Sequence, residues 1–177
     1  NGNREYISKL DGELIVYQAK SDFLIAASRL ASDRVADVRA VDGVADAGMI
    51  GTSSATLILD GGAKTLKVAL LGVEPGHVGE PAVVDGRQLG GETAEEVLID
   101  RSTALRTKLK VGDALTMRVT QGTSDEFFTL KIAGISDGQQ YSLQPSVFVP
   151  FQTWDRVRPQ SEAELKFTDV TANIIAV

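Results

Sequence analysis

Apolar and polar positions alternate over several segments of the chain, and this period of two predicts strands. The clearest case is an antiparallel hairpin with strands over 115–119 and 128–132 and a turn at 121–124. A second hairpin is predicted from a long or bent strand over 44–59, a tight turn at 60–62 and a return strand over 65–70. Strands therefore dominate the middle of the chain.

Shorter apolar runs predict strands elsewhere. The runs at 14–17, 97–99 and 147–149 are too short for helices and are flanked by turn residues or prolines. The last segment, 170–177, is apolar on both alternating faces. We therefore expect it to be a strand with neighbours on both sides.

Helical spacing of apolar residues predicts short helices between these strands. In the segment 32–43, Ser32 is placed to cap a helix whose apolar stripe is Val35, Val38 and Val41. Pro150 and Pro159 bracket a further helix with Phe151, Trp154 and Val157 on one face. A short lead-in helix is expected over 1–10 from the spacing of Tyr6, Ile7 and Leu10.

Asp100 is placed to cap another helix, directly after the 97–99 strand. Its buried face is predicted to carry Ala104, Leu105 and Leu109, and the turn at 110–113 ends it. With helices and strands in mixed order, the sequence predicts an α+β domain.

Composition narrows the class of protein. The 177 residues, 43% of them hydrophobic and 24% charged, suit a folded body with a sizeable core. A net charge of -6 gives no basic surface for phosphates, so we expect no nucleic-acid partner. The chain has no cysteine, which removes disulfides and thiolate chemistry but leaves the compartment open. Because the chain begins without Met and stops within a predicted strand, we expect an excised fragment whose membrane segments lie outside it.

Candidate catalytic groups are few. His77 is the only histidine and lies in a loop rich in glycine and proline, where a general base could stand. A hydrolase using His77 with a nearby Ser or Asp is one alternative, although no nucleophile-elbow motif accompanies Ser53, Ser54 or Ser102. An exposed loop imidazole is the simpler interpretation. Neither a cofactor nor a metal site is expected, because phosphate-binding glycine motifs and clustered ligands are both missing from the sequence.

Aromatic and apolar loop residues are the candidates for contacts with a partner or substrate. Phe148, Phe151 and Trp154 follow a strand and one helix face, which favours core packing. Tyr141 lies in a polar loop and is expected to be more exposed. Together with Phe23 and His77, Tyr141 makes up the predicted contact residues.

Four segments in succession resemble one known family. They are LIVYQAK with SDRVADVRAVDGV, then ALLGVEPG, then EEVLIDRSTALRTKLKVGDALTMRV with FFTLKIAGISDG, and finally SVFVPFQTWDRV leading into TANIIAV. This succession resembles the extracytoplasmic domain of FtsX-like ABC transporter permeases, the family with the MacB-like periplasmic core domain. The family implies a porter-like α+β lobe from 1–85 and 146–177, with a smaller, mainly β lobe inserted at 86–145.

The resemblance also implies a function. It predicts a non-catalytic domain on the extracytoplasmic side of a bacterial membrane, periplasmic or at the cell surface, that binds substrate or a partner and follows ATP-driven movement of membrane helices. Its partners would be a cytoplasmic ABC ATPase, the membrane through flanking helices, and a second permease or an extracytoplasmic adaptor. Besides the hydrolase, a secreted carbohydrate- or peptide-binding module is the other alternative.

Overall fold

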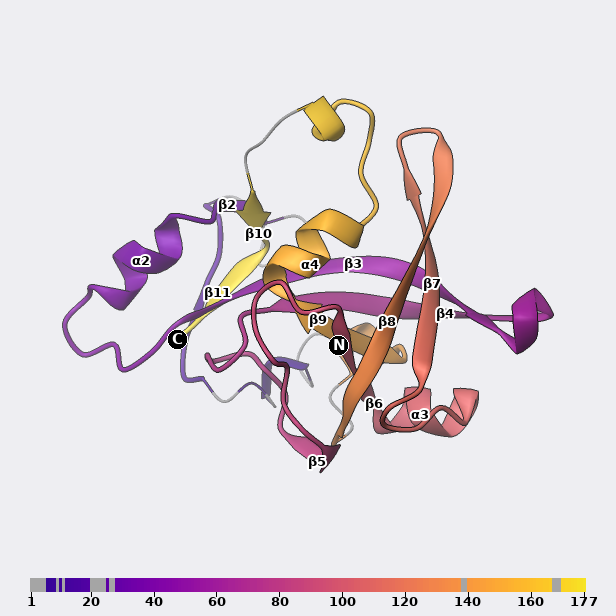
Figure 1. Ribbon diagram of the computed structural model, residues 1–177. Helices are drawn as coiled ribbons and strands as arrows, with labels where there is room; N and C mark the ends of the chain where they lie inside the picture. Colours follow the sequence, from indigo (N-terminus) through magenta and orange to yellow (C-terminus); the bar gives the residue numbers. More distant parts are fainter. Residues whose placement is uncertain are drawn as a thin grey trace.

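The computed structural model describes residues 6–8, 10, 12–19, 25, 28–137, 140–166 and 170–177. Within them, one nine-stranded sheet and one two-stranded sheet are combined with short helices, which confirms the α+β class (Figure 1). No helix in this described part of the chain is long and apolar enough to cross a bilayer.

Two long strands form the hairpin predicted in the first half of the chain. Strand β3 (Gly48–Leu59) pairs antiparallel with β4 (Lys64–Val73) over ten residue pairs, and the short helix η2 (Asp60–Gly62) turns the chain between them. Asp60, Gly61 and Gly62 all have positive φ angles, which explains the glycines at this turn. The prediction of this hairpin is confirmed.

The hairpin predicted from the strands over 115–119 and 128–132 is also confirmed. Strand β7 (Ala114–Gln121) pairs antiparallel with β8 (Ser124–Ser136), and Leu115 lies opposite Leu130 as the alternation requires. Before it come strand β6 (Glu96–Asp100) and helix α3 (Arg101–Thr107), which ends at Lys108 in the left-handed conformation.

Strand pairings between distant segments close most of the sheet into a ring. Strand β9 (Ser146–Pro150) runs parallel to β4 and antiparallel to β6, β6 pairs with β8, and β7 joins β8 back to β3. Helix α4 (Phe151–Val157) follows β9 with the bounds that the flanking prolines predicted. Strand β5 (Val83–Gly86) extends the sheet beyond β8.

An early strand and the last strand of the chain meet at the other edge of the sheet. Strand β1 (Ile15–Val16) pairs antiparallel with β11 (Ile174–Ala176), and β11 pairs with β3. Strand β11 therefore has neighbours on both sides, as predicted for the segment 170–177. The single strand expected over 170–177 is wrong, however: β10 (Thr171–Ala172) pairs with β2 (Leu30–Ala31) in the small sheet, and Asn173 separates it from β11.

Several short helices differ from their predictions. Helix α2 (Arg34–Arg39) begins after Asp33, which makes no side-chain capping bond, so the cap predicted at Ser32 is wrong. Val35 is buried there, whereas Val41 is exposed beyond the end of the helix. Among the described residues, residues 6–8 are helical within the predicted lead-in helix, and η3 (Tyr141–Leu143) and η4 (Glu164–Lys166) are one-turn segments.

Both faces of the central strands are buried, which explains why β4, β6 and β9 are almost continuously apolar. One face packs against α4, where Leu70, Ile99 and Val147 join Trp154. The opposite face, including Phe148, packs in a cluster with residues such as Tyr6, Ile25, Leu71 and Leu98. The predicted core roles of Phe148, Phe151 and Trp154 are confirmed.

The buried face predicted for helix α3 is confirmed in part, because Ala104 and Leu109 are partly buried against the core. Its fully buried residue is Thr103, whose hydroxyl donates to the carbonyl oxygen of Ser146 at 3.2 Å. Leu105 is 76% exposed, so its predicted burial is wrong. The division into lobes at 86 and 145 stays a prediction, although strands from both proposed lobes hydrogen-bond within one sheet.

Candidate functional site

The loop after β4 forms one wall of an open pocket of about 580 Å³ around His77. Gly76 and Gly79 have φ angles of 79° and 107°, so glycine lets the loop fold back sharply against the start of β3. The packing is close, because a Cβ on Gly48 would lie only 2.0 Å from the carbonyl oxygen of Val78. Gln88 and neighbouring residues of the segment after β5 form the opposite wall.

Asp46 holds this loop in place with both carboxylate oxygens. Its Oδ1 lies 2.8 Å from Nδ1 of His77, and its Oδ2 accepts a hydrogen bond of 3.0 Å from the peptide N–H of Val78. Partial burial alone raises the pKa of Asp46, but the bonds from His77 and from the N–H groups of Val78 and Ala47 outweigh burial and hold that pKa below its usual value. The carboxylate of Asp46 is therefore stabilised in its charged form.

A second polar cluster lies next to this pair. Oε2 of Glu74, a nearly buried carboxylate, accepts hydrogen bonds of 2.8 Å from Nη2 of Arg39 and from the peptide N–H of Met49. The pKa of Glu92 is raised, mainly by burial and to a smaller extent by the nearby carboxylate of Glu74. The charges of His77 and Arg39 lower this pKa but do not outweigh burial. The pocket region thus combines four acids with one arginine and one histidine, because Glu80 also lines the pocket.

In this pocket His77 could act as a base and Asp46 orients it, but no side-chain nucleophile for His77 to activate lines the pocket in the described part of the chain. None of the described residues that line it carries a hydroxyl or a lysine amine that His77 could activate. Ser53 instead accepts a hydrogen bond from Trp154, and Ser102 lies in α3. Among the described residues no group of three or more His, Cys, Asp or Glu side chains is arranged to hold a metal ion.

The other predicted contact residues do not gather at this pocket. Tyr141 is half-buried and therefore more exposed than Phe148, Phe151 and Trp154, as predicted. Its ring packs edge-on against Tyr6 with 5.5 Å between the ring centroids. Phe23 lies outside the described residues. The contact roles of Phe23, His77 and Tyr141 stay predictions.

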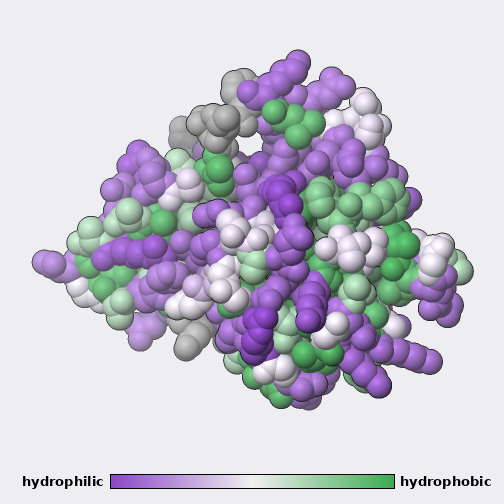
Figure 2. All heavy atoms as spheres, viewed as in Figure 1, coloured by the Kyte–Doolittle hydropathy of each residue, from purple (hydrophilic) through white to green (hydrophobic). Residues whose placement is uncertain are grey.

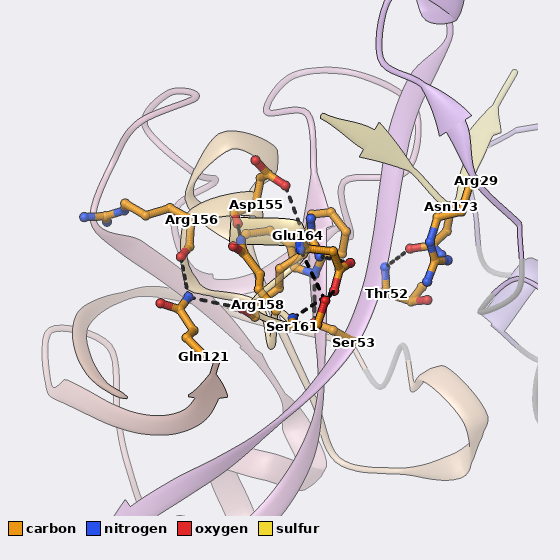
Figure 3. Close-up of polar contacts among 12 residues, drawn as sticks. Arg29, Thr52, Ser53, Gln121, Asp155, Arg156, Arg158, Ser161, Glu164 and Asn173 are labelled. Carbon is orange, nitrogen blue, oxygen red and sulfur yellow. Dashed lines mark hydrogen bonds and ion pairs between the residues drawn. The ribbon is translucent and has the colours of Figure 1, made fainter. Parts of the chain in front are cut away.

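Helix α4 is held by a polar network that the sequence patterns did not indicate (Figure 3). The guanidinium of Arg158 lies 5.3 Å from the ring centre of Trp154 and forms ion pairs with Asp155 and Glu164. From the β7–β8 turn, Gln121 Nε2 donates to the carbonyl oxygens of Arg156 and Arg158 at 2.7 and 3.2 Å. The hydrogen bonds from Gln121 join residues at least 35 positions apart, so the local pattern of the sequence carried little signal for them.

A second part of this network ties the C-terminal strands to β3. Oδ1 of Asn173 accepts a hydrogen bond of 2.6 Å from the peptide N–H of Thr52, and its Nδ2 donates to the carbonyl oxygen of Ser28 at 3.0 Å (Figure 3). Asn173 is buried at the break between β10 and β11. One side chain thus joins three segments that are distant in sequence.

Comparison with known proteins gives a match in structure alone. No protein-family model and no curated protein sequence matches the chain. The extracellular domain of the ABC-type transporter YknZ from Gram-positive bacteria is similar over 92% of this chain and 81% of that one, with a TM-score of 0.59 and 14% identity.

Two further solved structures are similar. The periplasmic region of MacB from Actinobacillus actinomycetemcomitans matches 82% of this chain with a TM-score of 0.57 and 12% identity. A permease domain from Porphyromonas gingivalis matches 80% of it with a TM-score of 0.53 and 21% identity. In both cases the match spans 63% of the other chain. The chain therefore has the fold shared by these periplasmic and extracellular domains of MacB, YknZ and the Porphyromonas permease.

Proposed function

We propose that this chain is the non-catalytic extracytoplasmic domain of an ABC transporter permease. The observation that carries the proposal is the shared fold, because the similar structures belong to MacB, to YknZ and to a permease. On this proposal the domain lies in the periplasm or at the cell surface, binds a substrate or a partner, and leaves ATP hydrolysis to a cytoplasmic ABC ATPase. A second permease or an extracytoplasmic adaptor would complete the assembly.

The pairing of an early strand with the last strand supports a mechanical role. Leu14 and Val177 exchange two backbone hydrogen bonds of 3.0 Å, so β1 lies beside the C-terminal end of the chain at β11. Because β11 also pairs with β3, a displacement of either strand would be transmitted to β3. In a permease with membrane helices on both sides of the domain, movement of those helices would rotate the domain as one lever.

The chemistry of the His77 pocket supports a non-catalytic role. A hydrolase needs a nucleophile or a positioned water beside its base, and the described residues lining the pocket offer only carboxylates, an amide and peptide groups beside the histidine. The Asp46 carboxylate is also occupied in holding the loop. A structural role for the His77–Asp46 pair accounts for both of its hydrogen bonds.

Three measurements on the full-length protein test the proposal. An alkaline phosphatase fused after Val177 should be active in living cells, because that enzyme folds only outside the cytoplasm. The full-length protein should enter the membrane fraction and co-purify in mild detergent with an ATP-binding subunit. Calorimetry of the protein without that subunit should detect no ATP binding. An inactive fusion, a protein that stays out of the membrane, or micromolar ATP binding would overturn the proposal.

A further inference from the structure

A groove of about 550 Å³ lies between helix α3 and the edge strand β5, away from the His77 pocket. We call it the α3 groove. Its apolar lining includes Val84 from β5, Leu105 from α3 and Ile135 from β8. Three elements separated in sequence therefore place apolar side chains around one groove. Single exposed apolar residues are common on protein surfaces, whereas a contiguous group of them marks an interaction site.

The apolar side chains of the groove are unusually open to solvent. Leu105 is 76% exposed and Val84 is 50% exposed. Strand β5 is the last strand of its sheet and pairs only with β8, so no described strand covers it. Over β5, at the lower edge of the view in Figure 2, hydrophobic side chains lie beside hydrophilic ones. Exposed leucine and valine next to an open sheet edge are typical of a surface that a partner covers.

Positive charge surrounds this apolar hollow. Arg101, Lys108 and Lys110 line the groove, whereas Asp85 is its one acidic lining residue. Arg101 forms an exposed ion pair of 3.2 Å with Asp137, but Lys108 and Lys110 have no carboxylate within ion-pair distance among the described residues. In a chain whose net charge is -6, this concentration of unpaired cations is a local feature.

We propose that the α3 groove binds an acidic amphipathic segment of an extracytoplasmic partner protein. Apolar side chains of the segment would cover Val84 and Leu105, and flanking carboxylates would pair with Lys108 and Lys110. The proposal rests on the proposed function only in placing the domain where such a partner can reach it.

An anionic membrane surface is the other class of partner that apolar and basic residues attract, and two observations disfavour it. The net charge of -6 repels the whole domain from anionic headgroups. In addition, α3 lies on the opposite side of the molecule from the C-terminus in Figure 1, so it is remote from the end where Leu14 meets Val177. A concave site also fits a protein segment better than a flat bilayer surface.

The test uses the full-length protein in nanodiscs of zwitterionic lipid and two fluorescent probe peptides of twelve residues. In one peptide leucines are flanked by glutamates, and in the other the same leucines are flanked by lysines. Fluorescence anisotropy should show at least tenfold tighter binding of the acidic peptide, and added salt should weaken that binding. Equal affinity for the two peptides, or no binding of the acidic one, would overturn the proposal.

Variants locate the binding to the groove. Leu105→Glu, and the double variant Lys108→Gln with Lys110→Gln, should each weaken binding of the acidic peptide by about tenfold. The matched controls, Val41→Glu and Arg34→Gln, change exposed residues on or near α2 and should change affinity less than twofold. Unchanged thermal unfolding of each variant shows that the fold is retained. Unchanged affinity for the acidic peptide in both groove variants would contradict the proposal.

Two further outcomes also count against the acidic protein segment. If vesicles containing phosphatidylglycerol bind the protein and the groove variants abolish that binding, the groove is a lipid-contact surface. If sedimentation shows self-association that Leu105→Glu abolishes, the occupant is a second copy of this chain. Because membrane insertion and ATPase co-purification are measured separately, failure of the groove proposal leaves the proposed transporter function intact, and the reverse also holds.

Discussion

Asp100 accepts a hydrogen bond of 3.0 Å from the peptide N–H of Ser146, although 46 residues separate the two in sequence. The other carboxylate oxygen of Asp100 accepts from the peptide N–H of Thr103 and so caps helix α3. Asp100 is completely buried. One carboxylate thus joins the end of β6, the start of α3 and the start of β9.

Replacement of Asp100 by Ala should therefore lower the free energy of unfolding more than the loss of a surface helix cap does. The variant loses the helix cap and leaves the buried N–H of Ser146 without its acceptor. Together these losses should lower the free energy of unfolding by about 3 kcal/mol. Asp100→Asn keeps one acceptor oxygen and should lose about half as much. Urea unfolding measures both variants, with the exposed Asp137→Ala as the control. A loss below 1 kcal/mol for Asp100→Ala would contradict this assignment.

Helix α4 depends on two glycines that give its tryptophan room. A Cβ on Gly72 would lie 2.4 Å from Cβ of Trp154, and one on Gly51 would lie 2.5 Å from the indole ring. Gly72→Ala should therefore destabilise the fold by about 3 kcal/mol through overpacking. Gly61→Ala, where the added Cβ meets nothing, should cost only the left-handed backbone penalty of about 1 kcal/mol.

A double-mutant cycle at Gly51, where the nearest atoms to an added Cβ all belong to the indole ring, separates this steric clash from a general intolerance of side chains. Trp154→Ala alone should cost about 4 kcal/mol, because it leaves a cavity in the core. With the indole removed, the methyl group of Gly51→Ala has space, so the double variant should be no less stable than Trp154→Ala. Additive losses in the two variants would show that the tryptophan is not what restricts Gly51.

Local patterns predicted the hairpins and α4 well, because the residues that determine these elements lie within or next to them in sequence. Alternation fixes which residues face the core, so the pairing of Leu115 with Leu130 follows from the pattern, and Pro150 and Pro159 fix the ends of α4. Leu105 was misplaced because an apolar residue at helical spacing is not always buried. The residue that α3 does bury, Thr103, is held by a distant carbonyl group.

Long-range contacts account for most of what the sequence could not predict. The ring closure of β7 onto β3, the break at Asn173 and the pairing of β10 with β2 each join segments that no local pattern relates. The candidate site was found only in part for the same reason. His77 was singled out as the only histidine, but Asp46, its partner, lies 31 residues earlier in a stretch with no distinguishing pattern.

The Asp46–His77 pair should make stability fall in acid. The pKa of Asp46 is lowered in the folded state, so its charged form stabilises the fold at pH values above the usual aspartate pKa of about 3.9. That stabilisation is lost as the pH falls through the lower folded pKa, because the proton then binds the unfolded chain more tightly. Urea unfolding between pH 7 and pH 2.5 should therefore show a smaller acid-induced loss in Asp46→Asn than in the parent protein.

His77→Ala provides the companion measurement for this pair. It removes the side-chain hydrogen bond to Asp46 but keeps the bond from the peptide N–H of Val78, so its acid dependence should lie between that of the parent and that of Asp46→Asn. Glu126→Gln, on the exposed part of β8, serves as the control for loss of a carboxylate elsewhere. If the parent and the Asp46→Asn variant lose stability equally in acid, the pair does not stabilise the loop.

Asn173 should be the most sensitive side chain of the C-terminal segment. Asn173→Ala leaves the buried N–H of Thr52 without its acceptor and the carbonyl oxygen of Ser28 without its donor, a loss of about 3 kcal/mol in the free energy of unfolding. Thr171→Ala, at a half-buried position two residues earlier, should cost less than about 1 kcal/mol.

Asn173→Asp separates the two halves of this contact. At neutral pH the carboxylate can accept from Thr52 but faces the carbonyl oxygen of Ser28, which repels it, so the aspartate pKa should be raised in the folded state. Protonation supplies a donor for Ser28 and removes the repulsion. The stability deficit of Asn173→Asp relative to the parent should therefore shrink between pH 7 and pH 4, whereas that of Asn173→Ala should stay constant. A deficit that grows in acid would mean that Asn173 does not donate to Ser28 in solution.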